Sequence, residues 1–71
     1  MPRDDARYLA QQGEALAQAL ERVANRLARD IGAEGGELAA MARMAVVDCQ
    51  LLRTRLRAIR RRLEAERSAT A

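Results

Sequence analysis

The stretch Asp30-Ile-Gly-Ala-Glu-Gly-Gly-Glu37 holds three of the four glycines in this 71-residue chain. Glycine readily adopts the left-handed backbone conformation that ends a helix, so this cluster predicts a turn at residues 32–36. The preceding sequence predicts a helix over residues 4–31, with Asp4 or Asp5 as its N-cap. A second helix is expected over residues 37–67, which contain neither proline nor glycine, and residues 68–71 are expected to fray.

Two long helices joined by a short loop predict an all-α fold, an antiparallel two-helix hairpin that forms a single domain over residues 1–71. Apolar residues spaced four and three apart support this interpretation and predict the seam along which the helices meet. The predicted seam of the first helix is Leu9, Gly13, Leu16, Leu20, Val23 and Leu27. The predicted seam of the second helix is Leu38, Ala42, Ala45, Cys49, Leu52, Leu56, Ile59 and Leu63.

The residues beside the first seam and the alignment of the two helices are also predictable. Ala10, Ala17 and Ala24 recur every seven residues beside the first seam, where small side chains allow a close approach. Folding the chain at the turn is expected to bring Leu56 near Leu9. Residues from Ile59 onward would then extend past the first helix or meet only the N-terminal residues.

The composition suggests that such a hairpin needs reinforcement. Hydrophobic residues make up 49% of the chain, but sixteen of the thirty-five are Ala and only eighteen are Leu, Ile, Val, Met or Tyr. A chain of this size seldom buries enough apolar surface to be stable alone. One cysteine cannot form an internal disulfide, and without histidine no zinc site or other cofactor is expected. We therefore expect association into a four-helix bundle or docking on a helical partner.

A second apolar stripe on the second helix is the predicted partner-binding surface. Between residues 38 and 52 only Arg43, Asp48 and Gln50 are polar, which is more apolar sequence than one seam requires. The alternative is that the additional apolar residues belong to a wide core face of a single hairpin. The predicted partner-binding residues, with Val46 at their margin, are Met41, Met44, Val47 and Leu51.

The basic residues are concentrated at the C-terminal end. Residues 1–52 sum to a charge of −2 and residues 53–71 to +5. Such a helix suits RNA, DNA or an acidic surface, although Tyr8 is the only aromatic residue and base stacking is therefore unavailable. One interpretation is that these charges are simply solvated. The alternative is a nucleic-acid-binding hairpin dimer that uses this segment. The candidate anion contacts are Arg53, Arg57, Arg60 and Arg61.

Catalysis is not expected, because the chain has no His, no Lys and no glycine-rich phosphate loop. Cys49 is expected to be an inert core residue, Asp30 a helix-end charge and Asp48 the partner of an arginine. No run of eighteen apolar residues is present, so no membrane span is predicted. A single unpaired cysteine fits a reducing compartment, and we expect a cytoplasmic location.

The pattern Leu20-Glu21, Leu27, Asp30 and then Gly35-Gly36 resembles the small helical-hairpin co-chaperones of bacterial type III secretion needle proteins. The resemblance covers about residues 14–63. It implies a short cytosolic hairpin that associates with a larger helical-repeat chaperone, the two together preventing early polymerisation of the needle subunit. The stripe formed by Met44, Val47 and Leu51 would then be the partner face.

Overall fold

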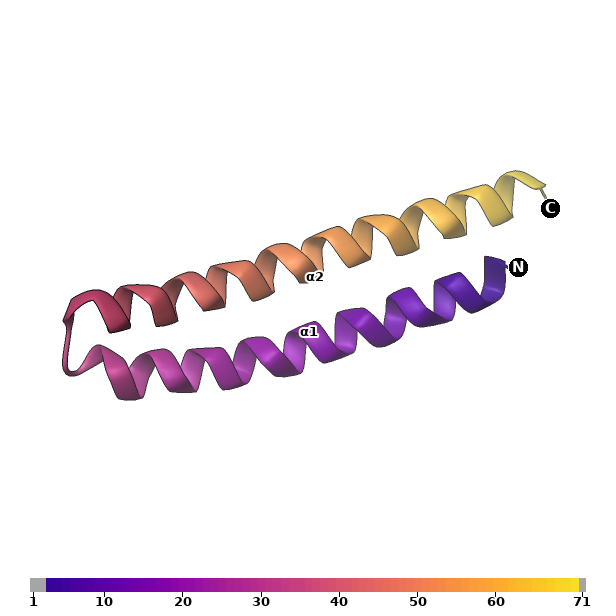
Figure 1. Ribbon diagram of the computed structural model, residues 1–71. Coiled ribbons are helices and arrows are strands. Elements are labelled where there is room, and N and C mark those ends of the chain that lie inside the picture. The colour runs from indigo at the N-terminus through magenta and orange to yellow at the C-terminus, as the bar shows by residue number, and fades with distance from the viewer. Residues whose placement is uncertain (1–2, 71) are drawn as a thin grey trace.

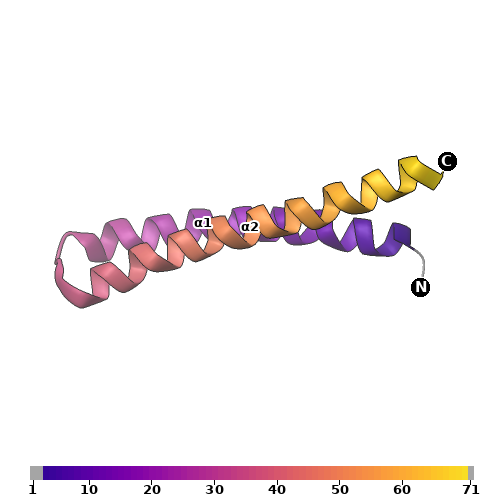
Figure 2. The same ribbon diagram turned by 90° about the horizontal axis from the view of Figure 1, so that it is seen from above.

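The chain folds into two antiparallel helices, α1 (Arg3–Gly32) and α2 (Gly36–Thr70), which lie side by side with both termini at the same end (Figure 1). The computed structural model describes residues 3–70, with side chains for residues 5–68. The molecule measures 55 × 16 × 14 Å, and α1 and α2 cross at a shallow inclination, as in a coiled coil (Figure 2). The prediction of an all-α hairpin is confirmed.

The turn lies within the predicted segment. The Glu34 amide donates to the Ile31 carbonyl at 2.9 Å, and the Gly35 amide donates to the Gly32 carbonyl at 3.2 Å. Gly35 and Gly36 have φ angles of 74° and 80°, which lie in the left-handed region that side chains disfavour. These two glycines therefore reverse the chain, and Glu37 follows in the first turn of α2, where the helix dipole favours an acid.

The outer ends of the helices differ slightly from the sequence-based expectation. Helix α1 begins at Arg3, so Asp5 lies inside the helix and does not cap it. The side chain of Asp4 lies outside the described residues. Helix α2 continues to Thr70, three residues beyond its predicted end at residue 67.

The helices meet through small residues. Among the described residues the only buried ones form what we term the alanine seam, namely Ala10, Ala17 and Ala24 of α1 with Ala39, Ala42 and Cys49 of α2. Ala17 is 2% exposed and Ala39 is 0% exposed, whereas no large side chain with described coordinates is fully buried. Half-buried residues continue the same face at spacings of three and four. They are Arg7, Glu14, Glu21, Ala28 and Ile31 in α1, and Val46, Arg53, Leu56, Arg60 and Leu63 in α2.

The predicted seam of α1 is therefore wrong by one residue, a rotation of about 100° around the helix. Leu9, Leu16 and Leu20 are 52–68% exposed, and Val23 and Leu27 are also exposed. The flanking alanines occupy the contact instead, because small side chains let the two backbones approach closely. In α2 half of the predicted seam is correct. Ala42, Cys49, Leu56 and Leu63 face α1. Leu38, Leu52 and Ile59 are exposed and Ala39, Arg53 and Arg60 take their places, whereas Ala45 is half-buried beside Val46.

The register also differs from the prediction. A Cβ atom at Gly13 would lie 3.0 Å from Leu56 Cδ1, so Leu56 packs on Gly13 and not near Leu9. The segment from Ile59 to Leu63 still lies beside α1, since Arg60 pairs with Glu14 and Leu63 is half-buried. Glycine at residue 13 leaves the room that the leucine side chain occupies.

Candidate interaction surfaces

One side of the hairpin carries a row of exposed apolar side chains on each helix, and we term these two rows the leucine face. Each of its residues comes one position before a residue of the contact between α1 and α2. Two antiparallel helices are related by an approximate twofold axis perpendicular to the plane that contains both, so equal offsets on the two helices emerge on the same side. The leucine face consists of Leu9, Leu16, Leu20, Val23 and Leu27 from α1 with Leu38, Leu52 and Ile59 from α2, all 45–68% exposed.

The opposite side of the hairpin is polar. Its residues come one position after a contact residue, and ten of these sixteen positions are amides or charged groups. The hairpin is therefore strongly two-sided, with apolar side chains on one surface and hydrogen-bonding groups on the other. The polar side consists of Gln11, Gln18 and Asn25 from α1 with Arg43, Gln50, Arg57 and Glu64 from α2.

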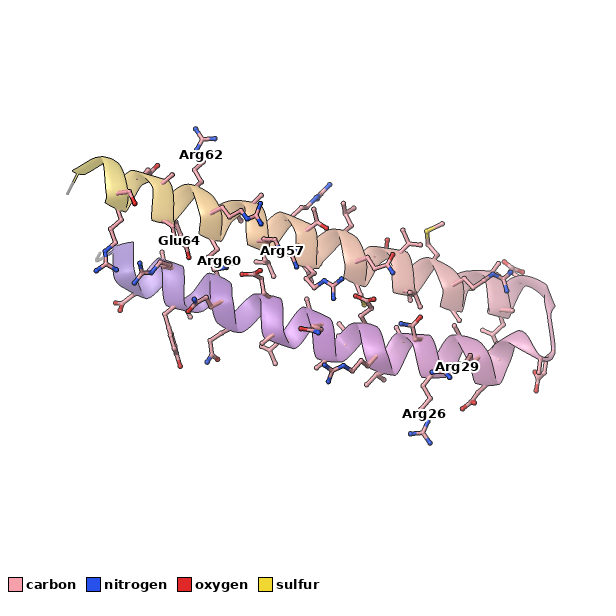
Figure 3. All side chains as sticks on the ribbon, turned by 180° about the vertical axis from the view of Figure 1, so that it is seen from behind. Arg26, Arg29, Arg57, Arg60, Arg62 and Glu64 are labelled. Atoms are coloured by element: carbon pink, nitrogen blue, oxygen red, sulfur yellow. The ribbon has the colours of Figure 1, made fainter. Side chains whose placement is uncertain are left out.

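Ion pairs join the two helices along the polar side. Glu14 accepts a hydrogen bond from Nε of Arg60, and its Oε1 lies 3.5 Å from Nε of Arg57. Arg60 also contacts Oε1 of Glu64 at 3.0 Å within α2. Figure 3 shows Arg57, Arg60 and Glu64 on the stretch of α2 that runs beside α1. These contacts fix the C-terminal half of α2 against α1.

A second cluster of polar contacts lies about two helical turns closer to the loop. Oε1 of Glu21 is 3.2 Å from Nη1 of Arg53, and its Oε2 accepts a hydrogen bond from Nε2 of Gln50 at 3.4 Å. The side chains of Glu14 and Glu21 are each only 15% exposed. Both acids lie in the contact face of α1, seven residues apart, and so meet arginines seven residues apart on α2.

These contacts affect the protonation of the acid at the centre of the first cluster. The hydrogen bond from Arg60 is the largest effect and lowers the pKa of Glu14 below its ordinary value. Burial opposes it, and the positive charge of Arg60 and the contact with Arg57 add to the lowering. The same hydrogen bond raises the pKa of Arg60. Glu14 is therefore held as a carboxylate in the folded hairpin.

The four predicted partner-binding residues all lie on the surface. We term Met41, Met44, Val47 and Leu51 the outer stripe, and each is 47–61% exposed. Val46, predicted at the margin of this stripe, is half-buried against α1 instead. The possibility that one hairpin simply has a wide core face is excluded by this exposure, because α1 leaves the outer stripe uncovered.

The predicted anion contacts divide into two groups. Arg53, Arg57 and Arg60 are paired with Glu14 or Glu21, so much of their charge is neutralised locally. Arg61 is exposed and makes no ion pair within residues 5–68. The sequence analysis missed Glu14 and Glu21, although their seven-residue spacing matches that between Arg53 and Arg60 and was visible in the sequence.

Three further residues were singled out from the sequence. Asp30 and Asp48 are exposed and have no ion pair among the side chains that the structure describes, so the arginine partner expected for Asp48 is absent from the hairpin. Cys49 is buried as a free thiol in the alanine seam. Residues 3–70 contain no group of three or more His, Cys, Asp or Glu side chains placed to hold a metal ion. Neither helix, over the same residues, is long and apolar enough to cross a membrane.

No protein-family model, curated protein or solved structure matches this chain.

Proposed function

We propose that the protein is a non-enzymatic interaction module, a two-helix adaptor that acts by binding other protein chains through its exposed apolar surfaces. One observation supports this proposal above all others. Thirteen large apolar side chains are exposed, whereas the buried core within the described residues consists of five alanines and a cysteine. Apolar surface of this extent marks protein interaction sites in proteins that remain soluble.

The energetics of the hairpin point the same way. Burial of apolar area contributes roughly 25 cal/mol per Å², and alanine offers little area. Small domains depend on disulfides, metals or association when their own core is this small. The single Cys49 forms no disulfide. Association is thus the source of stability that remains, and a free buried thiol also fits the cytoplasmic location that forms part of this proposal.

The outer stripe is the proposed docking surface for a partner helix. Its residues follow a helix-in-groove spacing of three and four, and its two methionines suit an adaptable contact. In its most specific form the partner is a helical-repeat chaperone and the protein a bacterial secretion co-chaperone. The resemblance of residues 14–63 to that family supports this form of the proposal.

The test replaces Val47 and Leu51 with Asp. The chain is immobilised and exposed to an extract of its native host, and the captured protein is produced separately for titration calorimetry. We expect Val47→Asp/Leu51→Asp to weaken the partner's affinity at least about a hundredfold, because two charges would be buried without partners. The matched control, Gln11→Asp/Gln18→Asp, adds the same charge on the polar side. Unchanged affinity in the first variant would refute the outer stripe as the docking surface.

Nucleic-acid binding is the second candidate function. Arg55, Arg61 and Arg62 favour it, because they are exposed and make no ion pair within residues 5–68, and Arg62 points away from α1 (Figure 3). The pairing of Arg53, Arg57 and Arg60 with acids on α1 weighs against it. Binding to duplex DNA or RNA should fall steeply with salt, and Arg61→Ala/Arg62→Ala should reduce the salt slope by about 2. Absence of binding at low salt would exclude this function.

A further inference from the structure

The whole hairpin leaves more surface exposed than a compact monomer of its mass does. The hairpin has an accessible surface of 5566 Å², whereas about 4,400 Å² is typical of a compact protein of this mass. The excess is of the order of 1,100 Å², and a stable interface buries about 800 Å² on each partner. The excess is therefore large enough for one interface of ordinary size.

The spacing of the residues on the leucine side of the hairpin predicts the shape of the partner that would bury them. On α1 the positions one before the contact are 6, 9, 13, 16, 20, 23, 27 and 30, and on α2 they are 38, 41, 45, 48, 52, 55, 59 and 62. Both sets alternate spacings of four and three, as a coiled-coil seam does. Each helix thus carries a second seam about 100° from the first, which is the pattern of a helix inside a four-helix bundle. The complementary partner is another pair of helices of similar length.

The charged residues on this side indicate that the second pair of helices belongs to another copy of this chain. They also determine the orientation of that copy. The seam of α1 is apolar except for Asp30 at its loop end. The seam of α2 contains Asp48, Arg55 and, near its C-terminal end, Arg62, none of which has an ion pair within residues 5–68. If two copies stack with their turns at opposite ends, α2 lies antiparallel on α2 of the second copy, and the centre of the stack falls near residues 52–53. Asp48 then comes within about one helical turn of Arg55 of the second copy, and the pair forms twice.

The other face-to-face arrangement lacks this complementarity. With both turns at the same end, α2 lies on α1 of the second copy, so Asp48 and Arg55 would be buried against leucine and valine. Burying a charge without a partner is strongly unfavourable. In the first arrangement α1 also lies on α1, which brings Leu16 opposite Leu20 and Leu9 opposite Leu27.

We propose that the leucine face is the interface of a homodimer in which two hairpins stack with their turns at opposite ends, Asp48 of each copy pairing with Arg55 of the other. This inference rests on the proposed function, an interaction module, and specifies one of its partners. The dimer covers the leucine face together with Met41, and it leaves the rest of the outer stripe, Met44, Val47 and Leu51, free for a different protein.

The first experiment measures mass by sedimentation equilibrium over about a hundredfold range of concentration. We expect twice the chain mass of 7.9 kDa. Leu16→Asp/Leu20→Asp should raise the dimer dissociation constant more than about a hundredfold, whereas Val47→Asp/Leu51→Asp, with the same added charge on the outer stripe, should leave it within about threefold. A wild-type monomer at every concentration, or the opposite response of the two variants, would overturn the proposal.

Charge reversal tests the pairing without disrupting the apolar contact. Asp48→Arg and Arg55→Asp each place like charges together in a homodimer and should each weaken it at least about tenfold. An equimolar mixture of the two variants restores both pairs, so the mixed dimer should regain affinity close to that of the wild type. A mixture no tighter than the separate variants would refute the Asp48–Arg55 pairing.

Orientation is measured by distances between spin labels attached through Ala33→Cys in a Cys49→Ala background. Turns at opposite ends predict a separation of about 45 Å, the length of the 30 residues of α1. A separation of about 20 Å, two helix diameters, would place the turns together and overturn the proposal. The two proposals fail separately, since loss of partner capture tests the outer stripe and loss of the dimer tests the leucine face.

Discussion

Leu56 of α2 packs on Gly13 of α1, and a Cβ atom at residue 13 would approach Leu56 Cδ1 to 3.0 Å. This contact explains how a glycine is accommodated in the middle of a 30-residue helix. Glycine in a helix interior costs about 1 kcal/mol relative to alanine. Its absent side chain provides the space for a leucine that would otherwise hold the helices apart. The contact also fixes the register between α1 and α2.

The Gly13–Leu56 contact predicts an unusual response to alanine. Gly32→Ala should stabilise the hairpin by about 0.4–1 kcal/mol, because it reduces the entropy of the unfolded chain and a Cβ there meets nothing within 4 Å. Gly13→Ala should gain less, since Leu56 must move. In a Leu56→Ala background Gly13→Ala should recover the full benefit of about 1 kcal/mol. Urea unfolding at one protein concentration measures each value, and equal gains in both backgrounds would contradict the contact.

The alanine seam predicts that a larger side chain at its centre destabilises the fold. Ala17→Leu should cost about 1–3 kcal/mol, because the helices must separate to accommodate it. Ala19→Leu is the matched control at an exposed position of α1, where the change should stay within about 0.5 kcal/mol. Thermal unfolding followed by circular dichroism measures both. An Ala17→Leu variant as stable as the control would show that the helices do not meet through the alanines.

The pairing of Glu14 predicts a loss of stability in acid. Its pKa in the folded state lies below the ordinary value of 4.5, so its contribution is fully present above pH 4.5 and disappears as the pH falls through the folded-state pKa. Glu14→Gln should be less stable than the wild type at neutral pH and should lose less stability in acid. Glu34→Gln, an exposed change in the turn, is the control. Identical pH profiles for wild type and Glu14→Gln would contradict the prediction.

The backbone at Gly35 predicts a sharp difference between two substitutions. With φ at 74°, Gly35→Ala should cost about 1–2 kcal/mol, because a Cβ atom clashes with the backbone in the left-handed region. Gly35→Asn should cost less, since asparagine tolerates this conformation. Urea titration of the two variants compares them directly. An alanine variant as stable as the asparagine variant would mean that the turn can adopt another conformation.

The sequence predicts some features of the hairpin reliably because they are local. Three glycines in residues 32–36 define the turn, and long segments without glycine or proline favour helix on either side. The exposure of the outer stripe was also predictable, because residues 38–52 contain more apolar side chains than one seam can bury. The pairing of Glu14 with Arg60 depends on the register between the helices, which periodicity alone does not give.

The leucine heptad in α1 is a real repeat, but its assignment to the contact with α2 was wrong. Leu9, Leu16, Leu20, Val23 and Leu27 keep the spacing of a seam, yet α2 contacts the parallel row of Ala10, Ala17 and Ala24 one position away. Both rows have the same period, so the period cannot distinguish between them. The small residues form the contact between α1 and α2 because they allow the helices to approach closely and bring Glu14 and Glu21 to their arginines.

By itself the sequence determined that the chain forms two helices, where it reverses, and that its helices carry more apolar surface than one hairpin buries. These properties follow from backbone preferences and from the spacing of residues along one helix. The tertiary structure alone decided that the alanines face inward and the leucines outward, and that Leu56 lies on Gly13. That choice depends on how closely two helices can approach, a property of the pair that neither helix encodes separately.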